Sequence, residues 1–255
     1  MKLSDLAVWW RLRRQVHEPW AATLLRKDRS PRVREVRFLD GRVVTLRCGT
    51  PDTQCFHHIF GCDEYRLDAL PAGCLDTVID VGAHVGLFAV KAAVLARRVV
   101  AIEPVEGNFR LLAQNVAASR LKNVKCMKAC LAERDGTARI FIAGRNDGHS
   151  IYGSGSGPAE TVPAFTLESV FRNEEVDRCS FLKLDCEGAE YAALFGAPKE
   201  LLDRIGRIVL EYHPVPDPTC TGERLAAHLR MAGFEVEIQP GKKKTQGLIF
   251  ANRKE

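Results

Sequence analysis

The chain has 255 residues, enough to bury the core of one α/β domain with a short extension. Its 46% hydrophobic and 27% charged residues are ordinary for a globular protein and exclude a disordered, fibrous or low-complexity architecture. A net charge of +5, from 37 basic and 32 acidic residues, could help to attract an anionic acceptor but is too small to indicate nucleic acid.

The cysteines and the amino terminus indicate a cytoplasmic protein. Nine cysteines are spread from Cys48 to Cys220 without a C-x-x-C pair or the dense spacing of a disulfide scaffold, which favours free thiols in a reducing compartment. Three arginines between positions 11 and 14 interrupt the first apolar stretch before it reaches the length of a signal peptide or a membrane span.

Residues 1–70 are expected to form an extension of a helix and a β-hairpin. Leu3, Leu6 and Trp10 fall at helical spacing, so this helix could rest on a membrane or a partner, although we prefer a helix that caps its own domain. Apolar runs at 36–39 and 43–46 flank Asp40-Gly41, a strong hairpin signal. A helix end and loop at 67–75 then lead into the main domain, residues 71–255.

From residue 77 onward, apolar β-branched runs alternate with helical stretches, which is the pattern of a largely parallel, doubly wound sheet. Strands are predicted at 78–81, 99–103, 124–128, 181–185, 208–212, 234–238 and 247–252. Helices are predicted at 85–96, 108–118, 189–195 and 224–231. The last two strands form a hairpin that suggests an antiparallel edge.

The stretch 144–158 breaks this alternation with glycines and polar residues. Long loops in compact domains commonly carry function, so we expect a mobile lid over an active site. The run at 242–244, three lysines at a predicted hairpin tip, most simply keeps that turn solvated, although it could meet an anionic acceptor.

The strongest chemical signal is an apolar strand that ends in Asp80 and turns through Gly82 and Gly86 into a helix. Glycine is needed where the backbone passes close to a ligand, and nucleotides bind at such turns in open parallel sheets. The next strand ends in Glu103, whose carboxylate can accept both hydrogen bonds of a ribose diol.

An NAD site is the natural rival, but the turn lacks the third glycine of G-x-G-x-x-G and hence the close approach of a pyrophosphate. S-adenosylmethionine has no phosphate, and the ammonium of its methionine tail would favour Asp80 by charge complementarity. The turn therefore favours S-adenosylmethionine as the cofactor.

Three segments in order resemble the FkbM-type methyltransferases, a branch of the class I fold that uses S-adenosylmethionine. They are Asp80-Val81-Gly82-Ala83-x-x-Gly86, Ile102-Glu103-Pro104 and Phe181-Leu182-Lys183-Leu184-Asp185-Cys186-Glu187-Gly188-Ala189-Glu190. The resemblance runs from about residue 64 to residue 252 and implies a Rossmann-like, seven-stranded sheet with a reversed last strand. It also implies methyl transfer, commonly to oxygen of sugars or polyketide-like natural products.

The resemblance assigns cofactor binding to the first two segments. The residues concerned are Asp80, Gly82, Ala83, Gly86, Glu103 and Pro104, together with Glu64, which matches an acidic position ahead of the first motif. His84 stands where asparagine is frequent in the family, and whether its side chain touches the methionine tail stays open.

The third segment and the following strand supply the candidate catalytic residues. Chemistry gathers at the carboxyl ends of parallel strands, so Asp185, Glu187 and His213 should lie beside the transferred methyl group. A hydroxyl acceptor needs its proton removed, and any of the three could act as the base. Lys183, within an apolar strand, is a further candidate or else a structural partner of Asp185 or Glu211.

Several alternatives stay open or are disfavoured. A divalent ion on Asp185, Glu187 and Glu211 is conceivable, but we prefer a site without metal because the sulfonium is already positively charged. The run 55–62, with two cysteines and two histidines, fits no common zinc spacing. Cys186 lacks a basic neighbour in sequence that would make it a nucleophile.

The expected function is methylation of a hydroxyl oxygen in a small molecule or glycan. The alternative is an RNA or protein methyltransferase that holds a polymer through the Trp- and Arg-rich amino terminus. However, enzymes that methylate amino groups of nucleic acid carry an Asn/Asp-Pro-Pro-aromatic signature after the fourth strand, and this chain does not. A protein that binds the cofactor without catalysis is the third hypothesis. The oligomeric state is not indicated.

Overall fold

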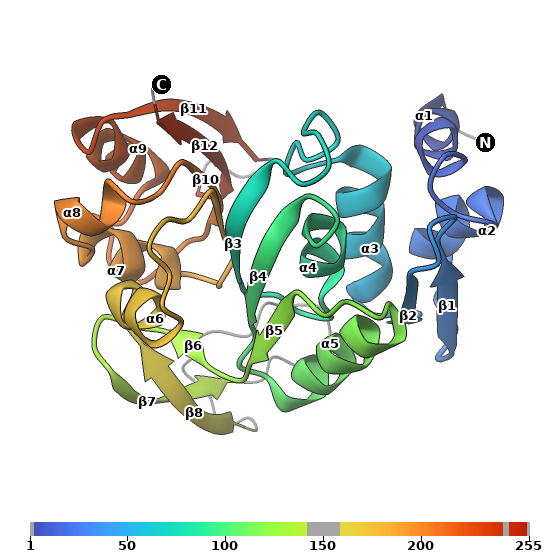
Figure 1. The fold of residues 1–255 in the computed structure, drawn as a ribbon, viewed down its shortest axis with the longest axis horizontal. Helices are drawn as coiled ribbons and strands as arrows, with labels where there is room; N and C mark the ends of the chain where they lie inside the picture. Colours follow the sequence, from blue (N-terminus) through green and yellow to red (C-terminus); the bar gives the residue numbers. More distant parts are fainter. Residues whose placement is uncertain (1–2, 142–158, 242–244, 254–255) are drawn as a thin grey trace.

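The computed structural model describes residues 3–141, 159–241 and 245–253. A twisted central sheet carries helices on both faces, and the amino-terminal elements gather at one end of the molecule (Figure 1). The expected lid at 144–158 and the lysine run at 242–244 lie outside the described residues.

Seven strands form the central sheet, in the order β11-β12-β10-β9-β3-β4-β5. Their bounds are β3 (Leu75–Val81), β4 (Ala96–Ile102), β5 (Val124–Met127), β9 (Phe181–Leu184), β10 (Arg207–Tyr212), β11 (Phe234–Pro240) and β12 (Gly247–Arg253). The strands from β10 to β5 pair in parallel, whereas β12 is antiparallel to both β10 and β11. The doubly wound, mostly parallel sheet with a reversed last strand is confirmed, and the hairpin of β11 and β12 closes one edge.

Side chains alternate between the two faces of this sheet, and each face is buried under its own helices. Val78 and Val99 belong to a core shared with α4 (Leu87–Ala92) and α5 (Glu106–Ala118). Ile79 and Val100 belong to a second core on the opposite face. That core is shared with α6 (Leu167–Asn173), α7 (Ala189–Phe195), α8 (Lys199–Leu202) and α9 (Gly222–Met231).

The amino-terminal elements pack into the first core. They are α1 (Leu3–Leu12), α2 (Pro19–Leu24), η1 (Leu25–Lys27), β1 (Val33–Arg37), β2 (Val43–Arg47), α3 (Asp52–Phe56) and the π-helix η2 (His57–Cys62). The predicted hairpin is present, with Val36 opposite Val44 and with Gly41 at a φ of 89° in the turn. Phe38 and Phe60 are almost fully buried, so the extension shares a continuous hydrophobic core with the sheet.

Several parts of the fold differ from the sequence prediction, which did not foresee the short helices α2, α3, η2, α6 and α8. The helix predicted at 85–96 ends at Ala92, because the Leu95 carbonyl accepts from the Leu75 amide and β4 begins at Ala96 beside Leu75. A separate three-stranded sheet, unforeseen, consists of β6 (Cys130–Leu131), β7 (Gly136–Phe141) and β8 (Ala159–Phe165). It lies beyond the carboxyl end of β5 and covers one side of the site described next (Figure 1).

Candidate functional site

Two adjoining cavities lie at the carboxyl ends of β3, β4, β9 and β10. The larger, of about 200 Å³, is lined by residues that include Gly82, His84, Ile102, Glu103, Pro104, Asn108, Ala129, Leu131, Ile140, Asp185 and Glu187. The smaller, of about 90 Å³, is lined by residues that include His58, Glu64, Tyr65, Ala83, Lys183 and Glu211. Cys55, Gly82, His84 and Asp185 line both, so the cavities meet at the glycine turn.

Both glycines of this turn are required by close packing. Gly82 has a φ of 73°, and a Cβ there would lie 1.7 Å from the carbonyl oxygen of Asp185. Gly86 has a φ of 84°, and its Cβ would lie 2.5 Å from Leu112 on α5. Gly82 lets the ends of β3 and β9 meet at the cavities, whereas Gly86 lets α4 pack against α5 and lines neither cavity.

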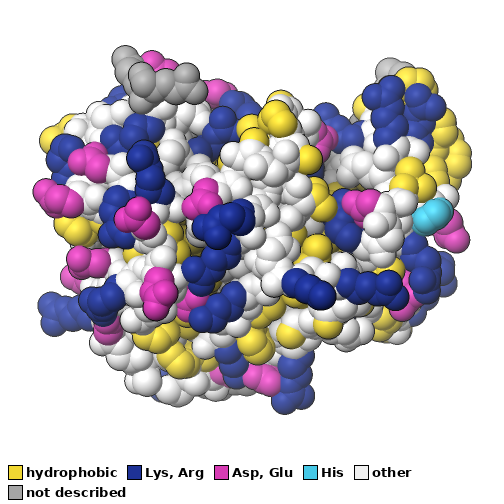
Figure 2. All heavy atoms as spheres, in the orientation of Figure 1, with side chains coloured by type: hydrophobic (Ala, Val, Ile, Leu, Met, Phe, Trp, Pro, Cys, Tyr) yellow, Lys and Arg dark blue, Asp and Glu magenta, His cyan; other side chains and the backbone are white. Residues whose placement is uncertain are grey.

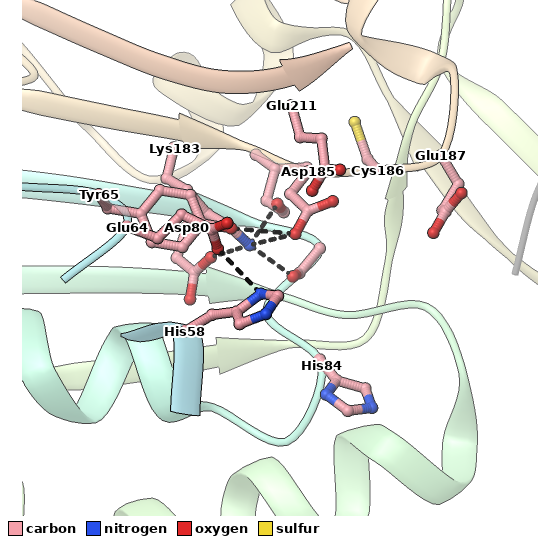
Figure 3. A network of polar contacts seen from close by, with 12 residues as sticks. His58, Glu64, Tyr65, Asp80, His84, Lys183, Asp185, Cys186, Glu187 and Glu211 are labelled. Carbon is pink, nitrogen blue, oxygen red and sulfur yellow. Dashed lines mark hydrogen bonds and ion pairs between the residues drawn. The ribbon is translucent and has the colours of Figure 1, made fainter. Parts of the chain in front are cut away.

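A buried ion pair lies behind the turn and joins β3 to β9. Asp80 and Lys183 are opposite each other in the parallel register, and their side chains meet at 3.0 Å (Figure 3). The Lys183 ammonium also donates to the Gly82 carbonyl oxygen at 2.7 Å. The sequence analysis paired Lys183 with Asp185 or Glu211, but its nearest carboxylate is that of Asp80, and Asp185 lies farther away at 3.8 Å.

Burial and charge pairing have opposite effects on the pKa values of Asp80 and Lys183. Burial alone would lower the pKa of Lys183, but the charges of Asp80 and Asp185 outweigh it and raise that pKa, so the ammonium stays charged. Burial raises the pKa of Asp80 against the opposing effect of Lys183. The Asp80 side chain is fully buried, so the structure places it behind the cavities and against Lys183 instead of in their walls.

Glu103 is held in place by the backbone of two loops. One carboxylate oxygen accepts from the amide of His84 at 2.9 Å and the other accepts from the amide of Val105 at 3.0 Å. The Asn108 amide group also reaches it, at 3.4 Å. Burial raises the pKa of Glu103 to about 7. The carboxylate thus lies in the wall of the larger cavity in a fixed orientation, beside Pro104.

His84 connects the glycine turn to the amino-terminal extension. It has a φ of 53°, and its Nε2 lies 3.3 Å from Asp52 at the start of α3. Burial lowers the pKa of His84 to about 4. Burial alone would raise the pKa of Asp52, but the hydrogen bonds from Arg47 hold it below its usual range. Sequence analysis missed Asp52 and Arg47, which no motif marks.

The segment after β9 is organised by a residue that the sequence analysis did not assign. Glu190 is fully buried, and its carboxylate accepts from the amides of Cys186 and Gly188, each at 2.8 Å. It also contacts Nδ1 of His213 at 3.0 Å. Glu187, at a φ of 55°, lies inside this turn. Glu190 therefore fixes both the turn and the histidine.

Asp185 lies at the centre of a polar cluster. The Tyr65 hydroxyl donates to one of its oxygens at 3.1 Å, and Nε2 of His213 lies 3.8 Å from the other. The same nitrogen lies 3.8 Å from Glu187 and 3.9 Å from Glu211. The arrangement brings together Asp185, Glu187 and His213, as the sequence analysis expected, and adds Tyr65 and Glu211.

The charged groups of this cluster shift one another's pKa values. Burial alone would lower the pKa of His213, but its hydrogen bond to Glu190 and the nearby carboxylates raise that pKa to about 10. Burial and the negative charge of Asp185 raise the pKa of Glu211 to about 7. His213 is thus an imidazolium near neutral pH, and it offsets the repulsion between the carboxylates around it.

The same cluster contains a set of groups that could hold a metal ion if His213 loses its proton. Asp185, Glu211 and His213 each offer one ligand atom, and these atoms lie within 4.8 Å of one another. In the part of the chain that the structure describes, the cysteines and histidines of 55–62 form no such set. Cys62 contacts His57, at 3.6 Å, whereas His58 faces Glu64, at 3.4 Å (Figure 3).

A family model and one solved structure identify a methyltransferase fold. The model of the methyltransferase FkbM domain matches residues 80–236. A solved methyltransferase FkbM from Methylobacillus flagellatus superposes with a TM-score of 0.52 at 14% identity, over 79% of this chain and 53% of that one. An rRNA methylase from Streptococcus thermophilus gives a TM-score of 0.46 at 12% identity, over 77% of this chain and 96% of that one.

A curated relative is the AMB antimetabolite synthetase AmbE of Pseudomonas aeruginosa. It is 26% identical over a match that takes in 72% of this chain. The chain spans 11% of the length of that relative, so the likeness concerns one segment of a much longer protein.

Proposed function

Since the chain belongs to the FkbM methyltransferase family, we propose that it transfers a methyl group from S-adenosylmethionine to a hydroxyl oxygen of a sugar, glycan or other small natural product. The observation that carries this proposal is the meeting of the two cavities at Gly82 and Asp185. One cavity wall contains the oriented carboxylate of Glu103, and the other contains the cluster around Asp185.

The walls of the larger cavity fit an adenosine group. Glu103 presents a carboxylate that two backbone amides orient, which suits the two hydroxyls of a ribose. Apolar side chains at Ile102, Leu131 and Ile140 suit a purine ring. Gly82 and His84, with Glu64 in the smaller cavity, are the groups available to the methionine end. When bound, S-adenosylmethionine would supply an activated methyl group.

The protein's own contribution to transfer is alignment of the acceptor and removal of its proton. Asp185 is the preferred base, because it reaches both cavities and the Tyr65 hydroxyl fixes one of its oxygens. His213 already carries a proton near neutral pH, so it suits an electrostatic role better than that of a base. Glu187 remains a second carboxylate at the rim, and Lys183 supports the site through Asp80.

The experiment that tests this proposal is a transfer assay with S-adenosylmethionine labelled on its methyl group. Cell extract is separated into glycan, lipid, metabolite, RNA and protein pools, and the Asp185→Asn variant serves as the inactive control. We expect label in the glycan or metabolite pool with the parent protein alone. Label confined to RNA or protein would replace the proposed acceptor class, and no label in any pool would favour a protein that binds the cofactor without catalysis.

A further inference from the structure

The amino-terminal elements carry the whole positive excess of this chain. Residues 1–37 contain ten Lys or Arg and four Asp or Glu, a balance of +6, whereas the other residues contain 27 and 28, a balance of −1. Such a separation concentrates a positive potential at one end of the molecule. The nearly neutral remainder gives no comparable attraction to an anionic surface.

Large hydrophobic side chains are exposed at the same end. Leu6 and Trp10 on α1 are 39% and 53% exposed, and Trp20 and Leu24 on α2 are 43% and 45% exposed. These four side chains are here called the Trp-Leu patch. Figure 2 shows Lys and Arg side chains beside hydrophobic ones over the end where Figure 1 places α1 and α2.

Ring contacts join the two helices and bring the basic groups to the patch. Trp9 of α1 stacks on Trp20 of α2, with ring centroids 4.9 Å apart and planes at 21°. The guanidinium of Arg13 lies 3.4 Å from the centre of the Trp10 ring, and that of Arg14 lies 5.9 Å from it. The patch is therefore one surface on which indole rings and guanidinium groups are adjacent.

The opposite face of α1 packs against the rest of the protein. Val8 and Leu12 are buried in the first core, and a Cβ at Gly61 of the π-helix would lie 2.8 Å from Val8. Because this face of α1 packs closely on the π-helix, the Trp-Leu patch on its other face points to solvent. The helix thus caps its own domain with one face, as the sequence analysis preferred, and leaves the other uncovered by the described residues.

We propose that the Trp-Leu patch, with Arg13 and Arg14, docks the protein on an anionic membrane surface. Trp and Leu side chains partition into the interface between headgroups and acyl chains, and arginines bind anionic headgroups, so the pairing matches an interfacial helix. A nucleic acid would make use of the arginines but not of the exposed leucines. No helix among the described residues is long and apolar enough to span a membrane.

The tryptophans make this proposal directly measurable. All three, Trp9, Trp10 and Trp20, lie on α1 and α2, so tryptophan fluorescence, excited selectively over that of tyrosine, reports on these two helices. The full chain is mixed with vesicles of phosphatidylcholine alone or of phosphatidylcholine with 30% phosphatidylglycerol, roughly the charge density at which basic segments bind. We expect a blue shift of emission and co-sedimentation with the anionic vesicles, both weakened by salt.

Two variants separate the apolar and basic parts of the patch. Trp10→Ser with Leu24→Ser leaves the Trp9 and Trp20 stack as a reporter and should abolish co-sedimentation. Arg13→Gln with Arg14→Gln should weaken it by about 30-fold, because each basic group near an anionic surface contributes about a factor of five. Circular dichroism and thermal melting confirm that each variant is folded.

Matched controls remove comparable groups elsewhere. Met231→Ser removes the large hydrophobic side chain that is most exposed among the described residues, at 86%. Lys122→Gln with Arg178→Gln removes two exposed basic groups outside the extension. Both controls should bind as the parent does. Absence of binding to anionic vesicles at low salt would overturn the proposal, as would equal loss in the controls, or a patch-dependent shift to dimer or to an RNA complex without vesicle binding.

Discussion

Asp80→Asn tests whether the ion pair behind the glycine turn holds the site together. The Asp80 side chain is fully buried and that of Lys183 is 4% exposed, so the substitution leaves an ammonium inside the protein without its nearest carboxylate. Removing one partner of such a pair typically costs about 3–5 kcal/mol. The Lys183 ammonium would still contact the Gly82 carbonyl oxygen, at 2.7 Å, and Asp185, at 3.8 Å. These contacts offset part of the cost of burying its charge, so we expect a loss of stability at the lower end of this range, about 3 kcal/mol.

For a chain of this length, a loss of about 3 kcal/mol lowers the melting temperature by roughly 6–12 °C, which scanning calorimetry resolves easily. Asp76→Asn is the matched control, because Asp76 lies on the same strand in a solvent-exposed pair with Arg97, which should contribute far less to stability. Adding Lys183→Met to Asp80→Asn should recover much of the loss. If Asp80→Asn melts no lower than the control, the pair does not support the site.

Further predictions concern the cluster around Asp185. Asp185→Asn should lower turnover by about 100-fold while cofactor affinity stays within a few-fold, and normal turnover in a stable variant would move the base to Glu187. Since the folded pKa of His213 is raised to about 10, its contribution to stability is complete below about pH 6.5 and is lost as pH rises through 10. Glu190→Gln should lower the pKa of His213 in a proton NMR titration, and an unchanged value would contradict the assigned contact. Dialysis against a chelator should leave turnover unchanged, whereas a loss restored by Mg²⁺ or Mn²⁺ would assign a cation to Asp185, Glu211 and His213.

The sequence predicted the central sheet well because β3, β4, β9 and β10 each contain an apolar run and because helical stretches separate most of the strands. The prediction of Glu103 at a strand end is matched by its position in the cavity wall, because the carboxyl ends of adjacent parallel strands meet at one edge. The small sheet of β6, β7 and β8 was missed, because β6 is only two residues long and because β7 and β8 include charged or hydroxyl side chains and flank the segment at 142–158.

The pairing of Asp80 with Lys183 depends on the register of two strands about 100 residues apart, which no local pattern encodes. The same limit applies to Asp52 and His84, whose contact depends on how α3 packs against the glycine turn. Glu190 was within the recognised motif, and its spacing from Gly188 in a helical first turn could have suggested that its carboxylate caps the preceding backbone.

Isothermal titration calorimetry with S-adenosylmethionine, S-adenosylhomocysteine and NAD tests the central claim most directly, using the parent and Glu103→Ala. We expect the first two compounds to bind the parent at one to one and NAD not to bind, because the turn at Gly82 does not suit a pyrophosphate. Glu103→Ala should remain folded and lose about 1.5–3 kcal/mol of binding free energy, the usual contribution of a hydrogen bond to a charged group. Binding of NAD at comparable affinity, or a Glu103→Ala variant that binds S-adenosylmethionine as tightly as the parent, would contradict the assignment of this cavity.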